Sequence, residues 1–219
     1  MPGERLILFV KHPRPGDVKT RLAQDLGVDD AASLYQVMAE HVVRETTPAA
    51  GGYERLVRFA PAEAEDAIAR WLPTVARAPQ AAGDLGVRMA DAFARAFGEG
   101  AGRVVLVGTD APGLDRVLVG QAFGALRDHD VVIGPACDGG YYLIGLAAPC
   151  EGVFEGVAWS TPAVFAQTVA RARALDLRTF TLPELRDVDT LDDVRREWKR
   201  LAPLLEGREA LRQRLERAL

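Results

Sequence analysis

Cysteine is scarce in this chain: Cys137 and Cys150 are the only two among its 219 residues. Two thiols are too few for a disulfide scaffold or for a four-thiolate zinc site. A chain of this length also buries a full hydrophobic core without such cross-links. We therefore expect both thiols to be reduced and the fold to depend on packing, as in a cytoplasmic protein.

Long apolar segments and a large excess of either charge are missing too. The apolar run at residues 6–10 is far shorter than the roughly 20 residues that a membrane-spanning helix needs, and no small-residue cleavage site follows it. The 27 basic and 31 acidic residues give a formal net charge of −4, which argues against a broad nucleic-acid face. The sequence thus predicts a cytoplasmic protein whose partners include no membrane and no nucleic acid.

Short apolar runs alternate along the chain with longer segments of helical period. We expect strands at residues 6–10, 55–59, 104–107, 131–133, 141–146 and 178–182, and helices at about 20–25, 30–46, 62–71, 84–97, 115–127 and 162–175. Such alternation predicts right-handed crossovers and a largely parallel sheet between two layers of helices. The residues placed to cap these helices are Asp29 or Asp30, Asp115 and Thr161.

The C-terminal segment, about residues 192–218, has no predicted strand and is rich in Arg, Glu and Leu. We expect one or two amphipathic helices there, interrupted near Pro203 and Gly207. They would cover a sheet edge or pair with a second subunit in a homodimer. With no internal repeat or linker, residues 1–219 are predicted to form a single domain with a helical extension at about 196–219.

The common nucleotide and hydrolase motifs are absent. Val18 stands where a Walker loop needs the glycine before its Lys-Thr pair. No G-x-G-x-x-G follows any predicted strand, and neither G-x-S-x-G nor H-E-x-x-H occurs. Three polar clusters remain at the carboxyl ends of predicted strands, where open α/β sheets place their ligands.

The first cluster is the loop that follows the first predicted strand. Pro15 stiffens this loop and Gly16 permits a tight turn. Lys19 and Arg21 come next, at the expected start of a helix, where free backbone N–H groups already favour an anion. The loop is therefore a candidate diphosphate site, and the alternative is a solvated turn with surface charges.

The second cluster, at residues 108–112, directly follows an apolar strand. Asp110 stands at the expected tip of that strand, where one carboxylate can hold Mg²⁺ or Mn²⁺ against substrate phosphates. The alternative for Asp110 is a turn or a cap before the next helix. Because Asp115 is available for that cap, we favour metal binding for Asp110.

The third cluster places Asp138 beside Gly139 and Gly140, a pair that lets a ligand approach the backbone closely. A simple Asp-Gly turn explains the same residues equally well. Further along, Asp187 and Asp189 lie one residue apart, so an extended segment would direct both carboxylates to one side as metal ligands. A cap for the helix expected near residue 191 explains Asp189 as well.

Five motifs occur in a fixed order: KHPRPGDVKTRLA at 11–23, GTDAP at 108–112, DGGYYLIG at 138–145, WST at 159–161 and DVDTLDD at 187–193. In this order the chain resembles a bacterial GT-A-like transferase family of once-uncharacterised domains. That family includes radical-SAM/selenodomain-associated transferases and arsenosugar-biosynthesis glycosyltransferases. It is related to phospholactate guanylyltransferase and the molybdenum-cofactor guanylyltransferases. The resemblance covers about residues 5–195.

The resemblance implies a nucleotide-diphospho-sugar transferase fold, which is a three-layer α/β/α sandwich with a mixed, mostly parallel sheet. By motif position it makes Lys19 and Arg21 phosphate ligands, in the loop that contains Pro15 and Gly16. It makes Asp110 a metal ligand and places Asp138 near the acceptor or the metal. The further candidates are Asp187 and Asp189 as metal ligands, and Gly139, Gly140, Tyr141 and Trp159 as substrate contacts.

Together these observations predict a metal-dependent enzyme that transfers a sugar from a nucleotide sugar to a small acceptor. Asp110 and Asp138 would be its catalytic residues, with Asp138 as the base for the acceptor hydroxyl. The alternatives are a nucleotidyl transfer from a nucleoside triphosphate to a phosphorylated acceptor, and a nucleotide-binding module without turnover. Prolines stand in the first loop where related nucleotidyltransferases carry glycines, which favours a diphosphate and hence sugar transfer.

Overall fold

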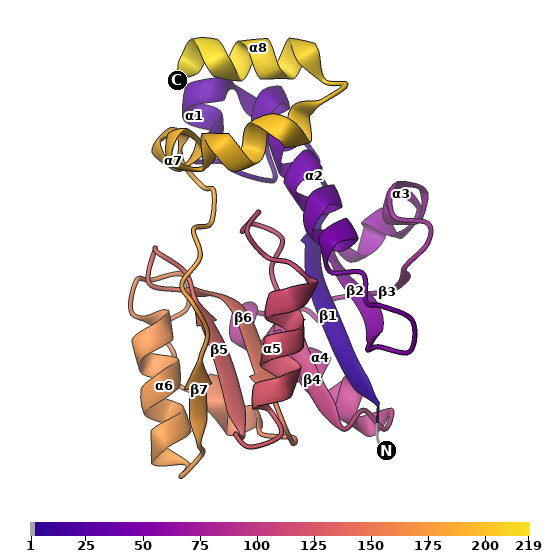
Figure 1. Cartoon of the computed structure of the whole chain (residues 1–219), viewed down its shortest axis with the longest axis vertical. Helices are drawn as coiled ribbons and strands as arrows, with labels where there is room; N and C mark the ends of the chain where they lie inside the picture. Colours follow the sequence, from indigo (N-terminus) through magenta and orange to yellow (C-terminus); the bar gives the residue numbers. More distant parts are fainter. Residues whose placement is uncertain (1–2) are drawn as a thin grey trace.

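The computed structural model describes residues 3–219 and is built around one seven-stranded sheet (Figure 1). The strand order is β3-β2-β1-β4-β6-β5-β7. Neighbouring strands run parallel except that β6 is antiparallel to both β4 and β5. The strands are β1 (Glu4–Lys11), β2 (Glu54–Ala60), β3 (Ala76–Pro79), β4 (Arg103–Val107), β5 (Val131–Pro135), β6 (Tyr141–Leu146) and β7 (Thr179–Thr181). The expected mixed, mostly parallel sheet is thus confirmed.

Helices connect these strands and flank the sheet. They are α1 (Ala23–Leu26), α2 (Val28–Glu45), α3 (Glu65–Trp71), α4 (Leu85–Gly98), α5 (Arg116–Ala125), α6 (Val164–Ala174), α7 (Leu191–Leu201) and α8 (Glu209–Ala218). Short 3₁₀-helices lie at η1 (Ala62–Ala64), η2 (Glu151–Phe154) and η3 (Ala202–Leu205). Across residues 3–219, none of the helices combines the length and the apolar character that crossing a membrane would require.

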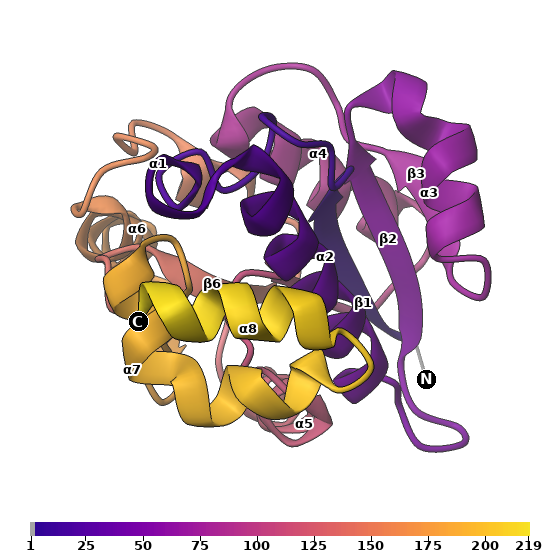
Figure 2. The ribbon, with the colours of Figure 1, turned by 90° about the horizontal axis from the view of Figure 1, so that it is seen from above.

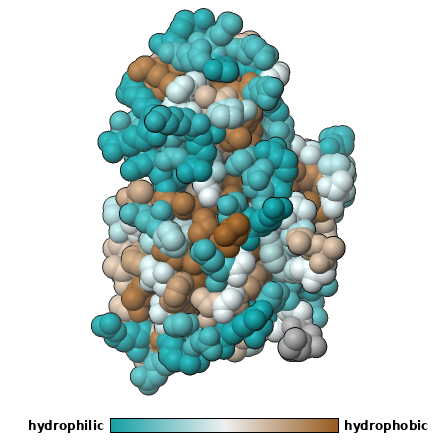
Figure 3. Space-filling model, in the orientation of Figure 1, coloured by the Kyte–Doolittle hydropathy of each residue, from teal (hydrophilic) through white to brown (hydrophobic). Residues whose placement is uncertain are grey.

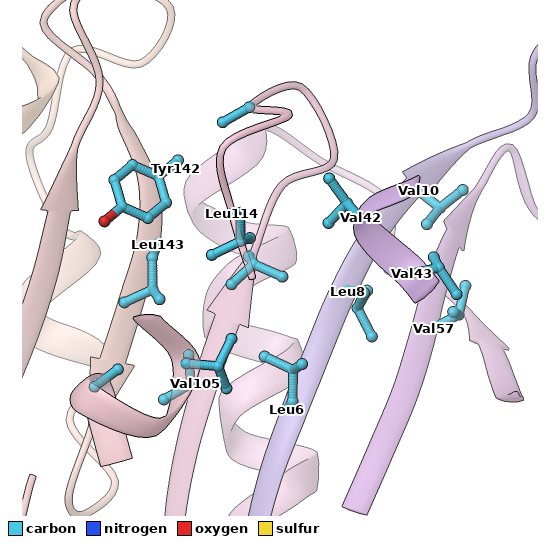
Figure 4. Close-up of a cluster of buried hydrophobic side chains, with 14 of the residues drawn as sticks. Leu6, Leu8, Val10, Val42, Val43, Val57, Val105, Leu114, Tyr142 and Leu143 are labelled. Atoms are coloured by element: carbon cyan, nitrogen blue, oxygen red, sulfur yellow. The ribbon is translucent and has the colours of Figure 1, made fainter. Parts of the chain in front are cut away.

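The sheet is covered on both faces, which explains why its strands are nearly continuous in apolar residues. Along β1, Leu6 and Leu8 contribute to a core shared with α2, α3 and α5, part of which is drawn in Figure 4. The intervening Ile7 belongs to the opposite core, which is shared with α4, α6 and η2. This alternation across the sheet produces the predicted three-layer α/β/α sandwich.

A helical cap, consisting of α1, the first half of α2, α7, η3 and α8, forms the upper part of the molecule in Figure 1. Its own core includes Leu34 and Met38 of α2 together with Leu201 and Leu215. The C-terminal helices therefore pack on α1 and α2, and the expectation that they cover a sheet edge is wrong. Seen from above, the cap leaves β2, β3 and α3 uncovered beside it (Figure 2). Its outer surface is mostly hydrophilic in the view of Figure 3, as amphipathic helices require.

The observed helix caps correct several expectations. Asp115 does cap α5, since its Oδ1 accepts hydrogen bonds from the N–H groups of Val117 and Leu118 at 2.9 Å. The other N-cap positions differ: Gly27 precedes α2 in place of Asp29 or Asp30, Ala163 precedes α6 in place of Thr161, and Thr190 caps α7 in place of Asp189. Thr190 forms a capping box with Asp193, so Asp189 is free for other contacts.

Two elements differ more substantially from the sequence prediction. The helix expected at 20–25 is reduced to the four residues of α1, because Lys19 takes a left-handed conformation with φ of +49° and residues 20–22 form a turn. Lys19 and Arg21 therefore do not start a helix. Strand β3 was not predicted because residues 76–79 are short, partly exposed and end in Pro79, as an edge strand allows.

Candidate active site

A cavity of about 360 Å³ lies at the carboxyl ends of β1 and β4. Because β6 is antiparallel, its first residues Tyr141 and Tyr142 line the same cavity. Further walls come from the first loop, α2, the segment after β3, the first turns of α4 and Asp189. Figure 1 shows that β1 runs from the N-terminus toward the helical cap, so the cavity lies at the end of the sheet that faces this cap. This is the edge at which α/β sheets bind ligands.

Lys19 joins two of the predicted carboxylates in this cavity. Its Nζ lies 2.5 Å from Oδ1 of Asp110 and 2.6 Å from Oδ1 of Asp189. The lysine side chain is only 4% exposed, whereas those of Asp110 and Asp189 are 49% and 40% exposed. The lysine side chain is therefore largely enclosed, whereas the two carboxylate side chains remain partly open to solvent, and all three line the cavity.

Backbone contacts bring these distant segments together. Asp110 follows β4 closely, and its carbonyl oxygen accepts a hydrogen bond from the N–H of Val188 at 3.0 Å. The side chain of Val188 is fully buried in the core of the helical cap. With Val188 directed into the cap, Asp189 is left beside the end of β4, where it meets Lys19.

The charge of Lys19 is stabilised by its two carboxylate partners, Asp110 and Asp189. Burial by itself lowers the pKa of Lys19, but attraction from Asp110 and Asp189 outweighs it, and the pKa is raised overall. Lys19 is therefore a permanent cation in the pH range of a folded protein. One ammonium between two carboxylates leaves a single net negative charge, which suits a divalent cation or a metal-bound phosphate better than a free anion.

The donor set fits a hard divalent cation on the exposed side of the carboxylates. Mg²⁺ binds one or two protein carboxylates and fills its other positions with water and substrate phosphate. Asp110 and Asp189 supply that number of ligands. Within residues 3–219, no three His, Cys, Asp or Glu side chains are grouped so that they could hold a metal. Asp187 thus does not complete a three-carboxylate cage with Asp110 and Asp189.

Asp138 closes a turn next to this site. Its Oδ1 accepts a hydrogen bond from the N–H of Gly140 at 2.8 Å, which matches the simple turn that the sequence allowed. Gly139 has a φ of +89°, and a Cβ there would lie 2.2 Å from the carbonyl oxygen of Pro162. The close backbone approach at this glycine is therefore made by Pro162. The cavity at the carboxyl ends of β1 and β4, called the main cavity below, is not lined by Asp138, Gly139 or Gly140.

Asp187 carries the most perturbed carboxyl group near the site. Burial raises its pKa to about 6, and repulsion from Asp138 and Asp189 adds to the effect. Asp138 and Asp189 are thus the carboxylates whose charge acts most strongly on Asp187. A raised pKa means that the folded protein favours the protonated form of Asp187.

This pKa predicts a change in stability between about pH 4 and pH 6. The pKa of Asp187 is higher in the folded state than in the unfolded state. The contribution of its protonated form to the free energy of unfolding is therefore complete below the ordinary pKa of 3.8 and is lost as pH rises through about 6. The free energy of unfolding of the parent protein should therefore fall across this window relative to Asp187→Asn, whose amide does not ionise. Urea denaturation in the presence of a chelator measures the difference.

The matched control for this measurement is Asp128→Asn, at an exposed position remote from the carboxylates. We expect its curve of unfolding free energy against pH to run parallel to that of the parent protein. If the Asp187→Asn curve is parallel as well, Asp187 has an ordinary pKa and the carboxylates are farther apart in solution.

The rest of the predicted phosphate loop lies outside the cavity. Pro15, Gly16 and Arg21 are exposed, and none of them is part of the cavity wall. Gly16 has the positive φ, +89°, that the expected tight turn needs. Lys19 is thus the one member of the predicted set Pro15, Gly16, Lys19 and Arg21 that the fold directs inward. A phosphate contact by Arg21 stays a prediction.

Tyr35 of α2 is a cavity residue that the sequence did not reveal. Its hydroxyl accepts a hydrogen bond from the N–H of Lys11 at 2.8 Å and lies 3.3 Å from Oγ1 of Thr109. Burial, with a contribution from Asp110, raises the pKa of Tyr35 to about 12, so the phenol stays neutral. It connects the ends of β1 and β4. In the sequence Tyr35 is indistinguishable from a core residue of an amphipathic helix.

Trp159 belongs to a second cavity, of about 330 Å³, between α4 and η2. Its indole packs on Gly86, where a Cβ would lie only 2.3 Å from Nε1. Trp159 does not line the main cavity, although the next residue, Ser160, does. Trp159 is thus a packing residue of the second cavity, and Tyr141 is the predicted substrate contact that reaches the main cavity.

The family described as "Uncharacterized protein conserved in bacteria (DUF2064)" matches residues 43–161, more than half of the chain. The chain belongs to this family. No curated protein matches its sequence. A crystal structure from Desulfovibrio desulfuricans G20, of a protein provisionally named a nucleotide-diphospho-sugar transferase, is 36% identical to it. The similarity covers 98% of this chain and 99% of that one, with a TM-score of 0.87. The resemblance to GT-A-like transferases and the predicted fold are confirmed.

More distant structures share the architecture. CMP:2-keto-3-deoxy-manno-octonic acid synthetase, solved in complex with CTP, is 12% identical and has a TM-score of 0.57, covering 93% of this chain and 99% of that one. Rv0371C of Mycobacterium tuberculosis H37Rv, solved in complex with manganese, is 15% identical with a TM-score of 0.54, covering 89% and 97%. At these identities the likeness concerns the fold.

Proposed function

We propose that this DUF2064 protein is a transferase that acts on a nucleotide-activated sugar and uses a divalent cation. The observation that carries the proposal is the position of Lys19 between Asp110 and Asp189, at a cavity formed by the carboxyl ends of β1 and β4. Carboxylates with exposed oxygens bind a hard cation, and a buried ammonium beside them attracts phosphate. The name of the relative from Desulfovibrio desulfuricans G20 supports the same class of reaction.

In this proposal the chain's own residues stabilise the leaving group. Lys19, fixed by two ion pairs, holds its positive charge near the diphosphate without reorganising during the reaction. The cation held by Asp110 and Asp189 would neutralise charge on the diphosphate oxygens. Asp138 is our candidate base for the acceptor hydroxyl, and its carboxylate contributes to the raised pKa of Asp187.

Nucleotidyl transfer is the second candidate. It is favoured by the fold shared with the synthetase solved in complex with CTP. The same Lys19 and Asp110 would then act on a triphosphate, and pyrophosphate would leave in place of a nucleoside diphosphate. A nucleotide-binding module without turnover is the third alternative, and metal-dependent product formation separates it from both enzymes.

Product analysis by ³¹P NMR distinguishes these reactions. We expect the protein, with Mn²⁺, nucleotide sugars and a panel of small acceptors that carry hydroxyl groups, to transfer the sugar to an acceptor hydroxyl and release a nucleoside diphosphate but no pyrophosphate. A parallel sample contains nucleoside triphosphates and phosphorylated acceptors. Pyrophosphate formed in the second sample alone would establish the nucleotidyltransferase and refute sugar transfer. Binding of nucleotides without product in either sample would favour the non-catalytic module.

A further inference from the structure

Gln80 and Arg88 form a second polar group in the main cavity, on the β2 side of β1. Gln80 lies directly after β3, and Arg88 is in the first turn of α4. Nη1 of Arg88 donates a hydrogen bond to Oε1 of Gln80 at 3.1 Å. The function proposed above assigns no role to either residue.

The orientation of the Gln80 amide is fixed by the backbone around it. Its Nε2 donates to the carbonyl oxygen of Arg58 at 2.8 Å and lies 3.5 Å from that of Val10. Because both neighbours are acceptors, the amide nitrogen faces the strands and Oε1 faces Arg88. Arg88 is fixed in turn, since its Nε donates to the carbonyl oxygen of Asp84 at 3.3 Å.

This arrangement leaves one donor and one acceptor side by side for a ligand. Arg88 retains unused guanidinium N–H groups, and Oε1 of Gln80 retains a lone pair. Leu85 and Met89 of α4 also line the cavity and supply apolar surface beside the pair. A flat ring with a carbonyl next to an N–H group matches this pattern.

We propose that Gln80 and Arg88 read the base of the nucleotide and select bases that carry a carbonyl beside a ring N–H. Guanine and uracil have that order of groups, an acceptor followed by a donor. Adenine and cytosine present an amino donor followed by a ring-nitrogen acceptor, so each contact would become a repulsion. The proposal rests on the proposed function, because it needs the phosphates at Lys19.

The layout of the cavity supports binding of a nucleotide with its phosphates at Lys19 and its base at Gln80 and Arg88. Lys19 and Asp110 lie at the β4 side of β1, whereas Gln80 contacts the ends of β1 and β2. The two groups are thus separated by about two strand spacings, roughly 10 Å. A nucleotide placed with its phosphates at Lys19 extends its base toward Gln80 and Arg88.

Calorimetric titration with GDP, UDP, ADP and CDP in the presence of Mg²⁺ tests the proposal. For the parent protein we expect GDP or UDP, or both, to bind at least about tenfold more tightly than ADP and CDP. In Arg88→Met the four affinities should come within about threefold of one another, while the affinity for inorganic pyrophosphate stays unchanged. Arg173→Met, the same substitution at an exposed position of α6, should keep the parent preference.

The outcomes separate this proposal from the proposed function. Equal affinities of the parent protein for all four nucleotides, or a preference for CDP or ADP, would overturn base selection and leave a nucleotide-dependent transferase intact. Absence of binding by every nucleotide and by pyrophosphate would refute both. Gln80→Met is the second variant, and loss of preference there with an unchanged melting temperature would assign the acceptor to Gln80.

Discussion

Replacing Lys19 by alanine should lower the free energy of unfolding by about 2–3 kcal/mol and weaken the binding of nucleoside diphosphates about a hundredfold. The stability effect follows from the removal of a buried cation that faces two carboxylates, since Asp110 and Asp189 would then repel each other. The partial exposure of the two carboxylates limits this repulsion. The loss of unfolding free energy therefore stays near the lower end of the range for broken buried ion pairs. Because the Lys19 side chain is only 4% exposed, this loss is larger than the small one expected for a charged side chain on a solvated turn.

Urea denaturation gives the stability change, and calorimetric titration gives the affinity. Lys199→Ala is the matched control, because it removes a lysine from an exposed position of α7. Lys19→Met keeps most of the aliphatic chain and removes only the charge, so it should reproduce both effects. A Lys19→Ala variant with parent-like stability and parent-like nucleotide affinity would mean that the ion pairs do not form in solution.

Asp110→Asn should lower turnover at least about a hundredfold and abolish its stimulation by Mg²⁺ or Mn²⁺ while the fold is retained. A divalent cation contributes several kcal/mol to charge stabilisation in phosphate chemistry, and each 1.4 kcal/mol corresponds to a factor of ten in rate. The amide keeps the size of the side chain but lacks the charge that a hard cation needs. Lys19 still has Asp189 as a partner in this variant.

The rate of nucleoside diphosphate release, titrated with Mg²⁺ and Mn²⁺, measures this effect. Asp115→Asn provides the control, since asparagine caps a helix as well as aspartate does and Asp115 is the N-cap of α5. If Asp110→Asn keeps a full metal response, the cation belongs to Asp187 and Asp189. If the variant unfolds, Asp110 is required for the fold, and its metal role is then judged from Asp189→Asn.

The sequence by itself determined the layers of the fold and several of the polar positions at the carboxyl edge of its sheet. Strands such as β1 and β4 are buried on both faces, so their apolar runs are visible without any partner. Residues that directly follow such strands must emerge at the carboxyl edge of the sheet, which is why Asp110 was found. The resemblance carried by the motifs implied ligand roles for Lys19 and Asp189, and the structure shows that these two side chains form an ion pair.

The tertiary structure alone decided which of these side chains meet and which do not. Lys19 and Asp189 are 170 positions apart in the chain, and their contact depends on how the helical cap packs on the sheet. Arg21 lies two residues after Lys19 and faces solvent, because the backbone turns there and does not form the expected helix. Such outcomes depend on backbone torsions and long-range packing, which periodicity along the sequence does not encode.

The same reason explains the residues that the sequence did not reveal. Three cavity residues are of types that are common at their places in the chain. Tyr35 lies within α2, Gln80 follows the edge strand β3, and Arg88 lies in the first turn of α4. Their positions in the cavity are fixed by hydrogen bonds of the folded chain: Tyr35 and Gln80 bond to the backbone of β1 and β2, and Arg88 bonds to Gln80. The sequence specifies which elements form, and the packing of those elements determines which polar groups share a cavity.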